Sequence, residues 1–141
     1  MAQMTWLQWA LLSALFAGLT AVLAKAGVRE IDSNLATAIR TVVVLVFAWS
    51  IVLVRGFDTW PKATSRTWLF LILSGLATGA SWLCYFRALQ LGDASRVAPV
   101  DKLSVVVAMV LAACFLGEHL TWRLWLGAGL IVTGTVVIAR A

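Results

Sequence analysis

Charged residues are scarce in this sequence of 141 residues. Only 12% of the chain is Asp, Glu, Lys or Arg, whereas 62% is hydrophobic. A soluble domain usually has about 25% charged residues, and a soluble fold of this size could not bury so much apolar surface. The apolar residues also come in long blocks. The composition therefore predicts an integral membrane protein.

Residues that carry enzyme chemistry are also rare. The single histidine, His119, follows Glu118 in GEHLT, which lacks the second histidine of a zinc-protease helix. There is no glycine-rich phosphate loop, and no pair of carboxylates shares an apolar block. Cys84 and Cys114 lie inside such blocks, where a free cysteine usually behaves as a small apolar residue. We expect no enzyme, disulfide, metal, cofactor or nucleic-acid partner.

Five apolar blocks are long enough to cross a bilayer, whose core of about 30 Å needs about 20 residues of helix. Helix is required because lipid offers backbone groups no other hydrogen-bond partner. The prediction is an all-α membrane protein, a bundle of five transmembrane helices in one domain covering residues 1–141. The predicted spans are residues 6–24, 35–54, 68–89, 97–116 and 122–139.

Polar residues, glycine and proline mark the ends of these blocks. Residues 32–34 (Asp-Ser-Asn) offer side-chain oxygens that can cap the second helix. Trp60-Pro61 breaks the chain before the third helix, and Gly92-Asp93 turns it before the fourth. Gly117 fits the end of the fourth helix, since glycine accepts the left-handed conformation that often follows a helix.

The distribution of lysine and arginine among the loops does not favour one orientation of the chain in the membrane. Side A is defined as the side that holds the N-terminus, and side B as the opposite side. Orientation normally follows an excess of Lys and Arg in the cytoplasmic loops, but four cations lie on each side, so the chain could insert both ways. They are Arg55, Lys62, Arg66 and Arg123 on side A, and Lys25, Arg29, Arg96 and Arg140 on side B.

Four charged residues fall inside predicted spans, in the third of the membrane nearest side B: Arg40, Arg87, Asp101 and Lys102. Charged side chains within a span are costly and usually face a bundle interior or a water-filled cavity. The cluster predicts a net cationic vestibule for an anionic or zwitterionic metabolite. Adjacent helix positions do not face each other, so Asp101 is expected to pair across helices with Arg87 or Arg40.

Another interpretation of the same charges stays open. The long Arg and Lys side chains can reach the headgroups, and Asp101 can be a helix-start charge at the interface. Pro99 favours this interpretation, because proline is tolerated in the first turn of a helix and would place Asp101 only about one turn deep.

Trp82, Tyr85 and Phe86 lie within about one turn of the third predicted span, with Gly79 leaving space beside them. We predict Trp82 and Tyr85 as the aromatic wall of a substrate cavity, since their polar atoms need partners when buried. The alternative is that these rings are packing mass in the bundle.

Two stretches resemble the EamA domain of the drug/metabolite transporter superfamily. FLGEHLTWRLWLGAGLIVTGTVVIA (115–139) is similar to that domain's Leu-Gly-Glu turn and glycine-bearing last helix. YFRALQLGDASRVAPVDKLS (85–104) resembles the junction of its third and fourth helices. The resemblance implies a carrier built from two five-helix repeats of opposite orientation. This sequence has one repeat, and carriers of this kind hold substrate between the halves, so a lone half is expected to dimerise.

The resemblance has one departure. Related small multidrug resistance proteins use a glutamate in the first helix to export cationic drugs, whereas this first helix has no acidic residue and offers Ser13 and Thr20, with Gln8 near its start. The expected function is that of a secondary transporter, exporting small metabolites across a bacterial inner membrane as an antiparallel, dual-topology homodimer. The alternatives are a half-size subunit that needs a different partner protein, and a membrane scaffold or assembly protein that transports nothing.

Overall fold

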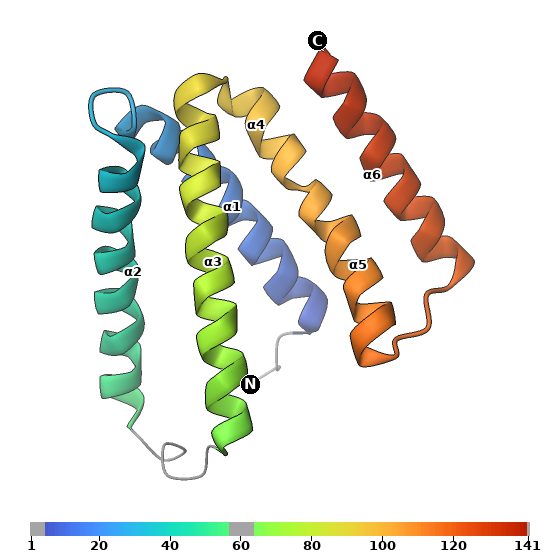
Figure 1. Cartoon of the computed structure of the whole chain (residues 1–141), viewed down its shortest axis with the longest axis horizontal. Helices are drawn as coiled ribbons and strands as arrows, with labels where there is room; N and C mark the ends of the chain where they lie inside the picture. Colours follow the sequence, from blue (N-terminus) through green and yellow to red (C-terminus); the bar gives the residue numbers. More distant parts are fainter. Residues whose placement is uncertain (1–4, 57–63, 141) are drawn as a thin grey trace. The chain divides into compact units, whose positions relative to one another are not determined.

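A computed structural model describes residues 5–56 and 64–140 as helices joined by short connections (Figure 1). Five segments are long and apolar enough to cross a membrane, and α4 and α5 together make one of them, Ala94–Leu116. This confirms the all-α fold with five spans. The predicted break at Trp60-Pro61 lies outside the described residues. The helices are α1 (Trp6–Gly27), α2 (Ser33–Arg55), α3 (Ser65–Leu91), α4 (Ala94–Asp101), α5 (Leu103–Leu116) and α6 (Trp122–Arg140).

The predicted end signals act at three connections. Asp32 is the N-cap of α2, and its carboxylate accepts hydrogen bonds from the backbone N–H groups of Asn34 (2.8 Å) and Leu35 (3.3 Å). Gly117 ends α5 in the left-handed region, with φ of +69°. Gly92-Asp93 separates α3 from α4. These signals work because a cap or a left-handed glycine satisfies backbone groups that a helix end leaves unpaired.

The fourth span is interrupted, which the sequence pattern did not predict. Its helix begins at Ala94 rather than near Val97, so the expectation that Pro99 lies in the first turn is wrong. Proline inside a helix has no N–H to donate and its ring crowds the preceding turn. After Pro99, the Lys102 N–H reaches the Pro99 carbonyl (3.1 Å) and the Val105 N–H reaches the Lys102 carbonyl (3.0 Å), each three residues back rather than four. Asp101 therefore lies about two turns into the span rather than one.

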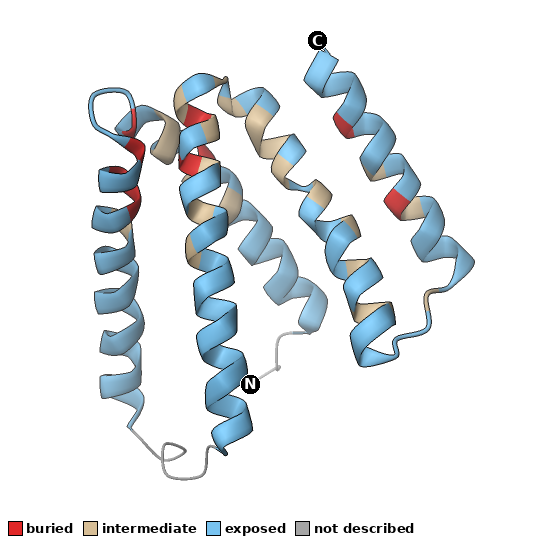
Figure 2. Ribbon diagram, viewed as in Figure 1, coloured by how far each residue is buried: buried red, intermediate tan, exposed pale blue. Residues whose placement is uncertain are grey.

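The chain divides into two compact units. One unit is Ala24–Leu91, which contains the last residues of α1 together with α2 and α3. In this unit α2 packs along α3. The buried residues of the two helices gather where the first turn of α2 meets the last turns of α3 (Figure 2). They are Ser33, Ala36 and Thr37 on α2 and Phe86 and Leu89 on α3.

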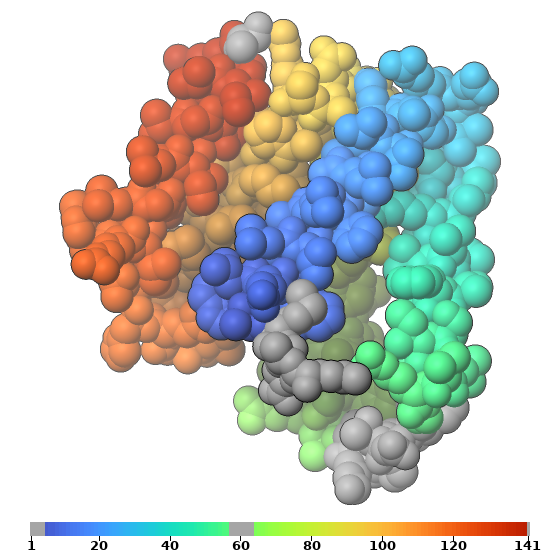
Figure 3. Space-filling view, turned by 180° about the vertical axis from the view of Figure 1, so that it is seen from behind, coloured from blue at the N-terminus to red at the C-terminus, as the bar shows by residue number. Residues whose placement is uncertain are grey.

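The other unit comprises the chain up to Leu23 and from Gly92 onward. Here α6 lies alongside α4 and α5 (Figure 3). Ala128 and Thr135 are the buried residues of α6, whereas large apolar side chains such as Phe115 remain exposed. Such exposure suits a chain whose surroundings are lipid. A single domain covering residues 1–141 would require these two units to pack on each other, so the single domain stays a prediction.

Candidate functional site

Arg40 is the centre of a cation–aromatic cluster in the Ala24–Leu91 unit. It is the eighth residue of α2, roughly 10 Å along the helix at 1.5 Å per residue. Its Cζ atom lies 4.5 Å from the ring centroid of Trp82 and 5.4 Å from that of Phe86. Positions 82 and 86 are four apart and share one face of α3, so both rings can meet the same guanidinium. The structure thus brings together Arg40 and Trp82, two of the predicted site residues.

Tyr85 extends this cluster. Its ring lies 6.4 Å from that of Phe86 at an interplanar angle of 70°, which is the edge-to-face arrangement that aromatic quadrupoles favour. Three predicted residues, Arg40, Trp82 and Tyr85, therefore belong to one cluster, with Phe86 as a fourth, buried member.

A cavity of about 200 Å³ lies beside Arg40 in the same unit. Its wall comes from the end of α1, the turn that follows it, the first turns of α2, and Phe86. Arg40 contributes the one polar side chain among the residues that line it. The apolar lining includes Gly27, Val28, Ile31, Ala36 and Ile39.

Arg87, another predicted site residue, is placed differently. Its side chain is exposed, and its Nη1 donates to Oε1 of Gln90 at 2.9 Å. Gln90 in turn donates through Nε2 to the carbonyls of Ile31 (2.8 Å) and Val28 (3.4 Å). Arg87 therefore contacts the turn between α1 and α2 through Gln90. The predicted pairing of Asp101 with Arg87 or Arg40 would join the two units, and it stays a prediction.

Asp101 and Lys102 form an ion pair with each other, with 3.6 Å between Nζ and Oδ2. The expectation that these neighbours do not pair is wrong. It assumed a continuous helix, in which adjacent side chains point about 100° apart. The helix ends at Asp101 and restarts at Leu103, so that spacing does not apply, and the long lysine side chain reaches its neighbour.

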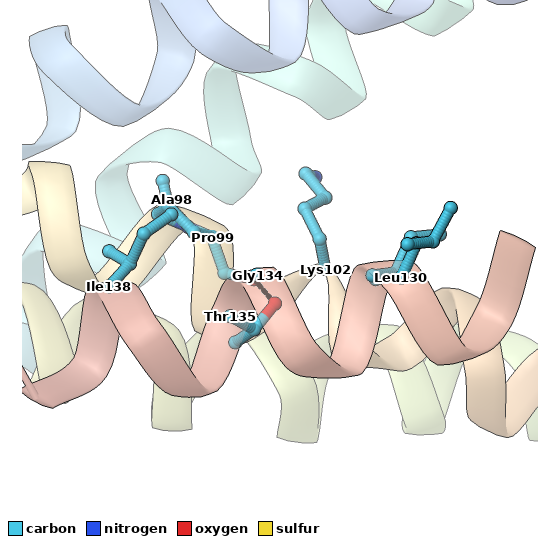
Figure 4. Close-up of a pocket in the computed structure, with 8 residues that line it drawn as sticks. Ala98, Pro99, Lys102, Leu130, Gly134, Thr135 and Ile138 are labelled. Carbon is cyan, nitrogen blue, oxygen red and sulfur yellow. Dashed lines mark hydrogen bonds between the residues drawn. The ribbon is translucent and has the colours of Figure 1, made fainter.

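Lys102 also borders an open groove of about 440 Å³ between α4 and α6 (Figure 4). The groove is otherwise almost wholly apolar, with Leu130, Ile131 and Ile138 among its lining residues. Thr135 is the exception, and its Oγ1 donates to the Pro99 carbonyl at 3.4 Å. This contact links α6 to the carbonyl next to the helix break.

Lys25 and Gln90 are residues that sequence reasoning did not assign to the site. The Lys25 Nζ donates to the Leu89 carbonyl at 2.7 Å, at the end of α3. Lysine near the last carbonyls of a helix is favourable, but here the lysine is 64 positions away in the sequence. A spacing rule that relates residues of one helix could not have predicted this contact between two helices. Together Lys25 and Gln90 hold the end of α1 against the end of α3, beside the Arg40 cavity.

The sequence matches the EamA-like transporter family over residues 4–140. The chain belongs to that family. This EamA-like chain is 56% identical over 138 residues to an uncharacterized transporter in the cobO 3′ region of Sinorhizobium sp., and the match covers 96% of each chain. The family relationship shows a multi-pass membrane protein of a transporter family that acts on small substrates.

Two further relatives differ in size and in name. A riboflavin transporter of Vibrio cholerae is 26% identical over 114 residues, which is 80% of the EamA-like chain and 38% of the relative. A probable 4-amino-4-deoxy-L-arabinose-phosphoundecaprenol flippase subunit ArnE of Aeromonas salmonicida is 30% identical over 79 residues, which is 56% of the chain and 67% of the relative. No solved structure matches the chain.

Proposed function

We propose that this EamA-like chain is a half-size secondary transporter, which exports small metabolites across the bacterial inner membrane as an antiparallel, dual-topology homodimer by alternating access. The observation that carries the proposal is a single repeat of five spans. Inverted-repeat carriers form their substrate site between two halves of opposite orientation, and two copies of the chain inserted in opposite senses would supply those halves. The Vibrio cholerae relative, of which the chain covers 38%, supports the half-size interpretation.

The balance of loop cations supports dual topology. Of the eight cations, Arg29 lies in a turn and Lys62 lies outside the described residues. The other six occupy end turns of helices: Lys25, Arg55, Arg66, Arg96, Arg123 and Arg140. Each keeps its side in the predicted topology, so the count remains four against four. With no excess on either side, the positive-inside rule favours neither orientation.

The proposed substrate vestibule has an excess of positive charge. Its members are three cations and one acid, together with the aromatic wall, and such a field attracts anionic or zwitterionic metabolites. The exposure of the Asp101–Lys102 pair supports a vestibule at this position, because both side chains are partly exposed, 36% and 55%, within a membrane span. Charges at this depth usually face a protein interior or water. The proposed members are Arg40, Trp82, Tyr85, Arg87, Asp101 and Lys102.

Cysteine labelling tests the dual topology. Cys84 and Cys114 are exposed and free, so both are first replaced by alanine. Single cysteines at Thr64 and at Gly92 should then each react with an impermeant reagent from both faces of the membrane, in part of the population. Labelling of each site from one face only would contradict the proposal.

A second candidate function is favoured by one comparison. The Aeromonas salmonicida relative is named as a flippase subunit, which suggests a half-size chain that needs a different partner. Coexpressing the Thr64→Cys and Gly92→Cys copies of the EamA-like chain without any other subunit, and crosslinking one to the other, separates the two candidates, because these two positions share a membrane face only when the copies are antiparallel. A homodimer that binds metabolites supports our proposal, whereas an inert monomer supports the subunit.

A further inference from the structure

We propose that the cavity of the Ala24–Leu91 unit binds a compact amphipathic anion, with a single carboxylate or phosphate held by Arg40 and an apolar body held by the cavity wall. The inference rests on the proposed function only where it makes this ligand the transported substrate. The binding itself requires no transport, and it names a narrower class of ligand than the net charge of the vestibule does.

The lining of the cavity defines the apolar part of the ligand. Every lining residue except Arg40 has an apolar side chain or, at Gly27, none. A ligand with two charged groups would leave one of them without a partner in this wall, and burying an unpaired charge is costly. The volume of about 200 Å³ lies below the roughly 300 to 1,000 Å³ of drug-sized sites. The apolar body is therefore small, such as one ring or a short chain.

The position of Arg40 defines the charged part. The Arg40 Cζ atom lies over the rings of Trp82 and Phe86, which attract the cation without supplying a carboxylate or carbonyl acceptor to its N–H donors. Among the described residues, no hydrogen bond or ion pair engages the Arg40 side chain, so its donating edge is free. A carboxylate or phosphate can accept two parallel hydrogen bonds from such an edge.

The location of Arg40 within a membrane span favours the binding of an anion beside it. Arg40 is partly buried in a span, where an unpaired cation is costly unless it meets an anion, a ring face or water. The two rings offset part of this cost, and an anionic ligand offsets more. Either a free metabolite or a lipid headgroup can supply that anion on an apolar body.

Calorimetric titration of the purified full chain in a neutral detergent tests the proposal. The probes are phenylacetate, octanoate and phenyl phosphate, compared with phenylacetamide, octanamide and phenol. At least one anion should bind at least tenfold more tightly than its neutral counterpart. Arg40→Gln should abolish that preference, whereas Arg66→Gln should keep it, because Arg66 also lies over a ring, that of Phe70 at 5.6 Å, but lines neither cavity described above.

A lipid arm identifies the source of the anion. Phosphatidylglycerol that competes with the bound probe, where phosphatidylcholine does not, assigns the site to lipid. Lack of competition by either lipid assigns it to a free metabolite. Both results support the anion site. The proposal is overturned if no anion and no phosphatidylglycerol binds, or if Arg40→Gln binds as the unchanged protein does.

A cavity-filling variant keeps the test valid should Arg40→Gln fail to fold. A Cβ added at Gly27 would meet no atom within 4 Å, so Gly27→Leu should fold and occupy the cavity. It should weaken anion binding at least tenfold with Arg40 intact. Gly75→Leu is the matched control, because that position also has open space and lines neither cavity. Binding by Gly27→Leu equal to that of the unchanged protein would overturn the site. If the unchanged protein binds the anion as expected but the cysteines are labelled from one face only, the dual-topology transporter alone is overturned.

Discussion

Arg40 contacts aromatic rings on another helix, whereas Asp101 contacts its neighbour in the sequence. The guanidinium lies over Trp82 and Phe86, an arrangement worth about 0.5 to 2 kcal/mol depending on how far it is desolvated. Asp101 contacts Lys102 across a break in the helix. Aromatic faces leave the hydrogen-bonding edge of an arginine available, while an ion pair occupies the carboxylate. This arrangement suits the ligand contact proposed for Arg40, whereas Asp101 balances the charge of Lys102 within the proposed vestibule.

Asp101→Asn should lose stability and metabolite binding far more than Asp93→Asn. The substitution leaves Lys102 unpaired within a span, which costs roughly 3 to 5 kcal/mol where the pair is desolvated and at most about 1 kcal/mol where it is exposed. Denaturant unfolding in detergent measures the stability, and calorimetric titration with small metabolites measures the binding. Asp93 is the control because it is an exposed residue in the connection before α4. Equal, small losses would favour the interfacial interpretation of Asp101.

The ends of α1 and α3 are linked by side chains rather than by a large apolar contact. Lys25 donates to the last turn of α3, and Gln90 donates to the turn that follows α1. Both contacts satisfy carbonyls that helix ends or turns leave without a backbone donor. The apolar side chains between them, Val28 at 2% exposure and Leu89 at 0%, are the most buried in the unit.

Lys25→Met should destabilise the chain by about 1.5 to 3 kcal/mol, the contribution typical of a hydrogen bond to a charged group. Methionine keeps the apolar stem, so the loss reports the ammonium contact. Thermal unfolding in detergent measures it. Arg29→Met, at an exposed position of the following turn, should change the stability much less. Equal effects of the two substitutions would show that the Leu89 contact contributes nothing of its own.

The interruption between α4 and α5 is a property of the whole span. Pro99 lies in the interior of α4, and the next turns use shorter-range hydrogen bonds. Pro99→Ala restores an N–H that can donate to the Ser95 carbonyl. We expect slower amide exchange at Lys102 and Leu103 and a higher unfolding temperature, because proline in a helix interior costs about 3 kcal/mol or more. Unchanged exchange at both amides would mean that the break has another cause.

For the whole molecule, the proposed dual topology depends on the balance of cations between the two sides. Thr64→Lys with Thr121→Lys adds two cations to side A, and Glu30→Lys with Asp93→Lys adds two to side B. Each pair alone should bias insertion and reduce activity, since lysine and arginine in short loops set orientation. Coexpression of the two biased chains should restore activity. Full activity of either biased chain by itself would contradict the antiparallel homodimer.

The sequence by itself determined the spans, the Asp32 cap, the Gly117 end and the family, because each depends on local chemistry or on apolar length. Lipid satisfies no backbone group, so a long apolar block has to be helical. Only the tertiary structure decided the contact of Arg40 with Trp82 and Phe86 and that of Lys25 with Leu89. These join residues on different helices, and helical periodicity describes one helix at a time. The break between α4 and α5 was also visible only in the structure, because the sequence did not show that α4 begins at Ala94 and so places Pro99 inside the helix.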